Sequence, residues 1–265
     1  MDMEPYWTSI ESILEQYLNL RKHIPSDWPR SITYEQVRQY DTHRTDKFWE
    51  HLNLSSLMYT LKNFNDKQTC ALYKSILNSL EWFSSEMITL PRAKRVLAPL
   101  WENQWNVADN PFWSVVSEVK LTRLLNNNGW TILGFDQKIG TSKKTADIRA
   151  RRTGIIHHID VEAASMTKIV NGDDVAFRSF ICKRVNDKIC KKFEVVPKDE
   201  YAVAALIFRP QAANLNRFTY KTSTTEMVKT ERKNVLGKVY WFVTSMPDDK
   251  NLELTLIDNM TSTIL

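Results

Sequence analysis

The sequence has few cysteines, and they are widely spaced. Cys70, Cys182 and Cys190 do not have the spacing of metal ligands. Cys182 and Cys190 are eight residues apart in a segment that we predict to be helical, so they lie about 12 Å apart along the helix axis, too far for a disulfide. A sparse, odd set of thiols is typical of proteins in a reducing compartment.

The sequence also lacks long apolar runs and internal repeats. No segment approaches the roughly 20 apolar residues needed to span a bilayer. The first residues are acids and Trp7, without the basic and apolar pattern of a secretory signal. We therefore expect a soluble, cytoplasmic protein with no membrane partner.

Charged residues are plentiful, but the excess of Lys and Arg over Asp and Glu is unevenly distributed along the chain. The chain has 265 residues, 43% of them apolar, and this length is sufficient for one large domain or two small ones. Its net charge is +5. Residues 1–110 contain 12 Lys and Arg against 14 Asp and Glu, whereas residues 111–265 contain 24 against 17. A one-sided basic surplus is expected of a protein that meets phosphates, although many basic proteins bind no nucleic acid.

The first part of the chain has a helical pattern. Apolar residues recur at helical spacing as far as about Trp105. We predict an all-helical N-terminal domain over residues 1–109, with roles in substrate positioning, binding of a protein partner or homo-oligomerisation. Residues 110–265 form a second predicted domain.

A new helix is predicted after Asn110 and Pro111, from Phe112 to about Asn127, ending at Gly129. Glu118 shares a face of this helix with Val115, Leu121 and Leu125. A carboxylate among aliphatic side chains is costly unless it is paired or binds a metal. The alternative is a carboxylate at the rim of the apolar stripe, paired with an arginine.

Three strands are predicted after this helix. They cover about 130–135, 146–151 and 155–163. A basic loop over 138–144 carries Lys143 and Lys144, and a tight hairpin turn over 152–154 joins the last two strands.

Alternation along these strands predicts that one face collects Asp147, Asp160 and Glu162. Carboxylates placed together repel one another and are commonly stabilised by hard cations such as Mg²⁺. Such a cation polarises phosphoryl oxygens and activates water, which is the chemistry of phosphodiester hydrolysis. The alternative is a solvated polar face balanced by nearby arginines. The adjacent His157 and His158 point to opposite faces and do not predict zinc.

The pattern of the remaining residues, taken with the three strands, predicts a mixed α/β sheet flanked by helices. Helices are expected at 174–193 and 224–234, and strands at 201–208, 239–244 and 252–257. In the first of these helices, Lys188 and Arg184 fall within the apolar stripe, whereas Lys183 and Lys192 point outward or lie near the end.

This order of elements resembles the core of the PD-(D/E)xK nuclease superfamily, the restriction-endonuclease-like fold. The similarity covers about residues 110–208 and rests on Thr145-Ala146-Asp147-Ile148 and Ile159-Asp160-Val161-Glu162-Ala163-Ala164. It implies a metal-dependent nuclease acting on DNA, with Mg²⁺ or Mn²⁺ bound by Asp147 and Glu162 and assisted by Asp160 and Glu118.

The motif departs from the superfamily at Ala164, where a lysine is usual. We predict that Lys188 replaces it, giving Asp147, Glu162, Lys188 and Glu118 as the catalytic set. Lys143 and Lys144 are weaker candidates for that lysine. Predicted contacts to nucleic acid come from Lys143, Lys144, Arg149 and Arg184. The alternative is a catalytically degenerate module that binds nucleic acid or a protein.

Overall fold

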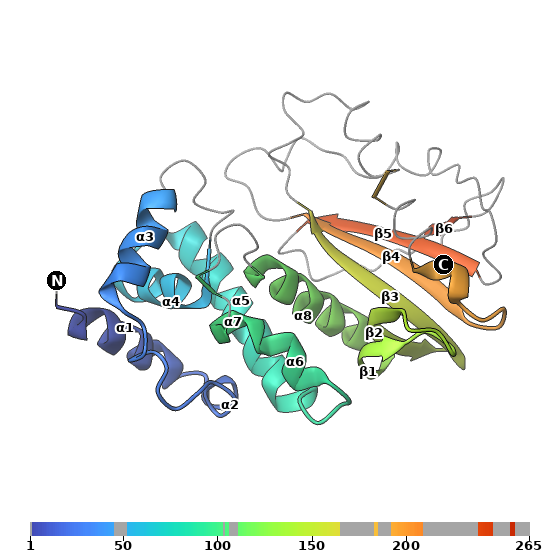
Figure 1. Cartoon of the computed structure of the whole chain (residues 1–265), viewed down its shortest axis with the longest axis horizontal. Coiled ribbons are helices and arrows are strands. Elements are labelled where there is room, and N and C mark those ends of the chain that lie inside the picture. The colour runs from blue at the N-terminus through green and yellow to red at the C-terminus, as the bar shows by residue number, and fades with distance from the viewer. Residues whose placement is uncertain are drawn as a thin grey trace. The chain divides into compact units, whose positions relative to one another are not determined.

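The computed structural model describes residues 2–44, 52–102, 104–105, 111–164, 183–184, 192–208, 238–245 and 255–257. The chain divides into two units, residues 1–123 and 124–265, and each is described by itself. The domain boundary suggested by the sequence, between residues 109 and 110, lies outside the described residues. Figure 1 shows helices in the first unit and a sheet in the second.

The first unit is built from helices packed on apolar faces. Helix α1 packs against α4, and both α2 and α4 pack against α5. On α5 the buried residues Tyr73, Ile76, Leu77, Leu80 and Phe83 recur every three or four positions, so they share one face. The helices are α1 (Glu4–Leu14), α2 (Leu18–Arg21), α3 (Tyr34–Arg44), α4 (Leu54–Asn63), α5 (Lys67–Glu86), α6 (Ala93–Leu97), α7 (Pro99–Glu102) and α8 (Phe112–Asn127), which crosses the unit boundary.

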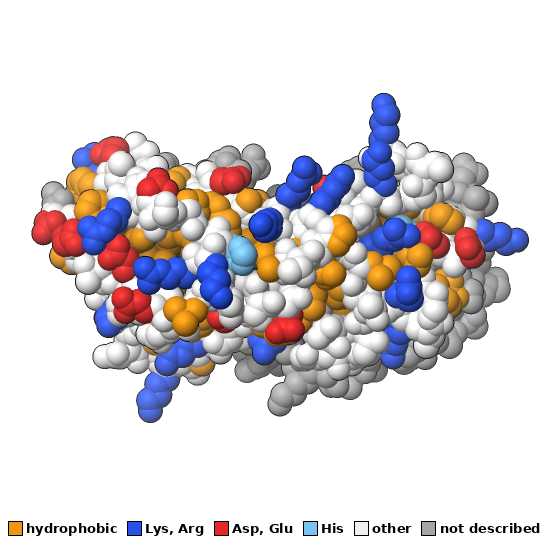
Figure 2. All heavy atoms as spheres, turned by 90° about the horizontal axis from the view of Figure 1, so that it is seen from below, with side chains coloured by type: hydrophobic (Ala, Val, Ile, Leu, Met, Phe, Trp, Pro, Cys, Tyr) orange, Lys and Arg blue, Asp and Glu red, His pale blue; other side chains and the backbone are white. Residues whose placement is uncertain are grey.

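Charged and apolar side chains are interspersed on the surface. On the face in Figure 2, Lys and Arg alternate with Asp and Glu, with small apolar areas between them. Large apolar side chains exposed in the described part of the chain are Leu18, Tyr34 and Phe64. No helix among the described residues is long and apolar enough to cross a membrane.

Side chains from several positions cap these helices. Asp66 caps α5 by accepting a hydrogen bond from the backbone N–H of Thr69 at 2.8 Å. Helix α2 has no side-chain cap of its own, and Glu81 of α5 supplies one. Its carboxylate accepts from the backbone N–H groups of Asn19 at 3.0 Å and Leu20 at 2.8 Å.

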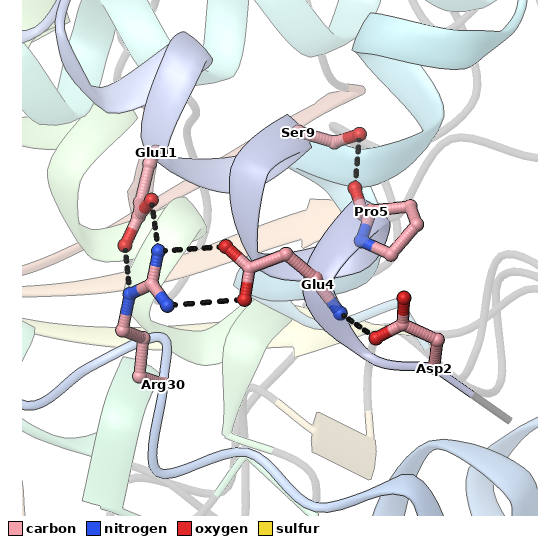
Figure 3. A network of polar contacts seen from close by, with 6 residues as sticks. All are labelled: Asp2, Glu4, Pro5, Ser9, Glu11 and Arg30. Atoms are coloured by element: carbon pink, nitrogen blue, oxygen red, sulfur yellow. Dashed lines mark hydrogen bonds and ion pairs between the residues drawn. The ribbon is translucent and has the colours of Figure 1, made fainter.

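An exposed ion-pair network fixes the start of α1 (Figure 3). The Arg30 guanidinium donates to both carboxylates of α1, Glu4 and Glu11, at 2.8 to 3.2 Å. The two carboxylates raise the pKa of Arg30, and its guanidinium lies 5.7 Å from the centre of the Trp7 ring. This network joins α1 to the segment that follows α2.

The second unit contains one mixed sheet with the order β1-β2-β3-β4-β5-β6 (Figure 1). Neighbours are antiparallel from β1 to β3, parallel from β3 to β5, and antiparallel between β5 and β6. The strands are β1 (Thr131–Lys138), β2 (Thr145–Arg152), β3 (Ile155–Ala164), β4 (Tyr201–Phe208), β5 (Lys238–Ser245) and β6 (Thr255–Ile257). The predicted mixed α/β class is thus confirmed.

The hairpin between β2 and β3 has a two-residue turn. Thr153 has φ 49° and Gly154 has φ 84°, the two positive angles of a type I′ turn, which matches the twist of the flanking strands. Because Arg152 faces Ile155 across the turn, the pairing continues in step to Ile148 opposite Ile159. Turn length therefore fixes which side of β3 each side chain occupies.

Local predictions agree with the structure at several element ends. Helix α8 ends at Asn127, and Gly129 follows with φ 78°. Strand β1, by contrast, extends to Lys138, which the sequence placed in the loop, because Lys138 pairs with Thr145.

The predicted helix at 224–234 and nearly all of that at 174–193 lie outside the described residues. A short 3₁₀ helix, Phe193–Val195, precedes β4.

Candidate active site

One face of the sheet carries the charged residues of β2 and β3, and we call it the charged face. Arg149 pairs with His158, and His158 pairs in turn with Ala202 of β4. Side chains of paired residues lie on the same side of a sheet, and the side alternates along each strand. The charged face therefore includes Asp147, Arg149, His158, Asp160 and Glu162.

Asp147 lies where β2 and β3 cease to pair through their backbones. The ladder runs to Ile148 opposite Ile159, and beyond it the Asp147 carboxylate accepts a hydrogen bond from the backbone N–H of Val161 at 2.7 Å. This bond satisfies a strand N–H with a side chain and fixes the carboxylate at the edge of the cluster.

Lys192 joins Asp147 to Asp160. Its ammonium forms an ion pair with the fully buried Asp160 and lies 3.7 Å from a carboxylate oxygen of Asp147. Burial alone lowers the pKa of Lys192, but the two carboxylates outweigh that effect and hold it above its ordinary value. At neutral pH the group between these carboxylates is therefore a cation.

The sequence predicted that Lys192 points outward or lies near the end of a helix, and the structure shows its side chain turned toward the carboxylates of Asp147 and Asp160. That prediction assumed that a regular helix continues to Phe193 and fixes the direction of each side chain. Instead Lys192 has φ −123° and ψ −41°, outside the helical range, and precedes the 3₁₀ helix. Lys192 is therefore not part of a regular helix, and its ammonium contacts Asp160.

Glu162 is paired on the same face with Arg184. One oxygen of Glu162 lies 3.1 Å from a guanidinium nitrogen of Arg184, whose side chain is 41% exposed. The guanidinium of Arg184, a predicted contact to nucleic acid, thus lies at the carboxylate cluster.

Glu200 forms a second charged group with two strands, which we call the Glu200 clasp (Arg149, His158 and Glu200). One oxygen of Glu200 is hydrogen-bonded to Nε2 of the buried His158, and the other lies 3.7 Å from Arg149. Burial lowers the pKa of His158, while Glu200 opposes the shift, so the imidazole is neutral at pH 7. Sequence reasoning missed Glu200 because its partners depend on the alignment of β3 with β4.

The opposite side of the sheet, which we call the apolar face, holds His157. Its ring makes edge contacts with Trp130 and Tyr201, with centroids 4.5 and 5.2 Å away. Burial lowers the pKa of His157 to about 4, and Arg152 adds to the shift. His157 and His158 thus face opposite sides, as predicted.

The other predicted site residues are in the loop before β2, in the first unit or outside the described residues. Lys143 is exposed and Lys144 is half-buried in the loop before β2. Glu118 belongs to the first unit, half-buried on a helix whose Val115, Leu121 and Leu125 are buried. Lys188 lies outside the described residues, so its assignment stays a prediction.

The carboxylates of the charged face offer oxygen atoms, the ligands that hard cations prefer. The ammonium of Lys192 is the positive charge that lies between Asp147 and Asp160. Among the residues that the structure describes, no three His, Cys, Asp or Glu side chains are grouped as metal ligands. Mg²⁺ usually needs just one or two carboxylates, with water completing its coordination, so the donor set fits it.

Comparisons with known protein families, with curated proteins and with solved structures returned no match.

Proposed function

We propose that the charged face is the active site of a metal-dependent nuclease that hydrolyses phosphodiester bonds in DNA. The observation that carries the proposal is the Lys192 ammonium between Asp147 and Asp160. A superfamily member needs two acids and a lysine at one place, and the sequence has alanine at position 164. Lys192 supplies such a lysine from another segment.

The strand order supports the resemblance to the restriction-endonuclease-like fold. A helix, three antiparallel strands and a fourth strand parallel to the third follow one another along the chain. We assign Asp147 on the second strand and Glu162 on the third as the counterparts of the superfamily's two acids. In this proposal they hold Mg²⁺ or Mn²⁺, with Asp160 as an auxiliary ligand, and the role expected for Glu118 stays a prediction.

The chain's own residues have distinct roles in the proposed reaction. A bound divalent cation supplies polarisation of the phosphoryl oxygen and activation of water. Lys192 is protonated, so it donates hydrogen bonds and stabilises charge on the phosphate instead of accepting a proton. Asp147 is kept in place by the N–H of Val161.

The test is cleavage of single-stranded, duplex and branched DNA with Mg²⁺ or Mn²⁺. We expect Asp147→Asn and Glu162→Gln to abolish cleavage, and Lys192→Met to lower kcat by about 10² to 10³, the usual effect of removing a charge-stabilising donor. Lys183→Met is the matched control, because Lys183 is exposed in the same part of the chain. Cleavage by Asp147→Asn at the wild-type rate would contradict the proposal.

A second candidate is a nuclease-like module that binds nucleic acid or protein without cutting. It is favoured by Ala164 and by the cations that already neutralise the carboxylates, Lys192 and Arg184. Metal-independent DNA binding, unchanged in Asp147→Asn and with no cleavage of any substrate, would support this alternative.

A further inference from the structure

The Glu200 clasp lies on the charged face beside the carboxylate cluster and is not used in the proposed chemistry. Arg149 is two residues from Asp147 on β2, so their side chains leave the same face roughly 6.8 Å apart. A guanidinium at that separation from a cleavage site is close enough to contact a neighbouring phosphate of the same strand.

The side chain of Glu200 is held in place by its hydrogen bond with His158. One of its oxygens is bound to His158, whose side chain is completely buried between neighbouring strands. A carboxylate fixed by a buried ring has lost most of its rotamer freedom, so it presents its other oxygen in a defined direction. That oxygen faces Arg149.

Arg149 keeps its hydrogen-bonding capacity in this arrangement. The 3.7 Å separation from Glu200 attracts the guanidinium but is too long for a hydrogen bond. Its Nε is buried, but 32% of the side chain is exposed, and it is this exposed part of the guanidinium that a phosphate can reach. An oriented guanidinium with available donors is well suited to bind phosphate in a bidentate manner.

We propose that Glu200 is a positioning residue, which holds Arg149 to bind a backbone phosphate next to the one that is cleaved. This inference rests on the proposed nuclease function and adds a residue to its substrate contacts. It also explains why a carboxylate lies on a surface that must approach polyanionic DNA.

A purely electrostatic role for Glu200 predicts the opposite effect on binding. If the carboxylate merely neutralised Arg149, its removal would leave a more positive surface and tighten DNA binding. If it positions Arg149, its removal weakens binding despite the loss of a negative charge. Whether removal of the Glu200 carboxylate tightens or weakens DNA binding therefore distinguishes an electrostatic role from a positioning role.

The experiment measures the dissociation constant of the full chain for a fluorescent DNA duplex in EDTA, at several salt concentrations. We expect Glu200→Gln to raise Kd about fivefold. Arg149→Ala should raise Kd and reduce the slope of log K against log salt by about 0.9, the value for one phosphate contact. Glu194→Gln, which removes the same charge at an exposed site, should leave Kd unchanged or lower it.

The double variant tests whether Glu200 acts through Arg149. In an Arg149→Ala background, Glu200→Gln should cause no further loss, because there is no guanidinium left to orient. Arg149→Lys keeps the charge and should weaken binding as Glu200→Gln does; it provides the test if Glu200→Gln fails to fold. Tighter or equal binding by Glu200→Gln, or additive losses in the double variant, would overturn this inference alone. No binding of DNA by the wild type at low salt would overturn the proposed function as well.

Discussion

His157 contacts aromatic rings from two other segments, Trp130 and Tyr201, on the apolar face. Its folded-state pKa of about 4 lies below the ordinary value of 6.5, so the unfolded chain binds a proton more readily. The stability contributed by the neutral ring is complete above pH 6.5 and is lost as pH falls toward 4.

We expect the wild type to lose about 2 kcal/mol of unfolding free energy from this group between pH 7.5 and pH 5. His157→Phe keeps an aromatic ring among its neighbours but cannot take up a proton, so its loss over this range should be smaller by that amount. Urea unfolding at both pH values measures the difference. Parallel pH profiles for the two proteins would show that His157 does not titrate in this range.

The direction of His157 and His158 follows from strand alternation, but their environments do not. His157 is covered by residues 27 positions earlier and 44 positions later, and His158 is bonded to Glu200, 42 positions later. Such partners depend on tertiary packing and leave no local pattern in the sequence.

At the scale of secondary-structure elements, the turn between β2 and β3 combines a favourable and an unfavourable residue. Gly154 adopts a positive φ without strain, whereas Thr153 is β-branched and has φ 49°. No atom lies within 4 Å of a Cβ added at Gly154, so the cost of substitution there is conformational.

We predict that Thr153→Asn stabilises the protein by about 1 kcal/mol, because asparagine tolerates the left-handed region and Asn-Gly is a preferred type I′ pair. Gly154→Ala should destabilise it by a similar amount. Thermal and urea unfolding of the two variants should therefore shift in opposite directions. A shift of the same sign in both would argue against this turn conformation.

Elements defined by local pattern were predictable, and those defined by distant pairing were not. The bounds of α8 and β4, the hairpin and the common face of Asp147, Asp160 and Glu162 follow from periodicity and turn residues. The approach of Lys192 to Asp160 does not, because it depends on how the backbone bends before the 3₁₀ helix. The parallel alignment of β3 with β4 is likewise absent from the sequence pattern.

At the scale of the whole molecule, metal binding should appear as a change in folding stability. A ligand that binds only the folded state stabilises it, by about 1.4 kcal/mol at ten times its Kd. For a chain of this size we expect the melting temperature to rise by roughly 3 to 5 °C with saturating Mg²⁺. Asp147→Asn should abolish the rise.

Lys192→Met provides a second arm of the same measurement. Without the ammonium, Asp160 is left as a buried carboxylate with less compensation, so the variant should melt below the wild type in EDTA. Mg²⁺ should then raise its melting temperature more than it raises that of the wild type, while Lys183→Met should behave as the wild type does. An unchanged wild-type melting temperature in Mg²⁺ would contradict metal binding.

The two-residue turn at Thr153 and Gly154 has a consequence far from its own position. If β3 paired with β2 one residue out of register, His157, Ile159 and Val161 would lie on the side of Asp147, and Asp160 and Glu162 would move to the apolar face. The acidic cluster therefore depends on the turn that keeps Arg152 opposite Ile155, at the far end of the hairpin.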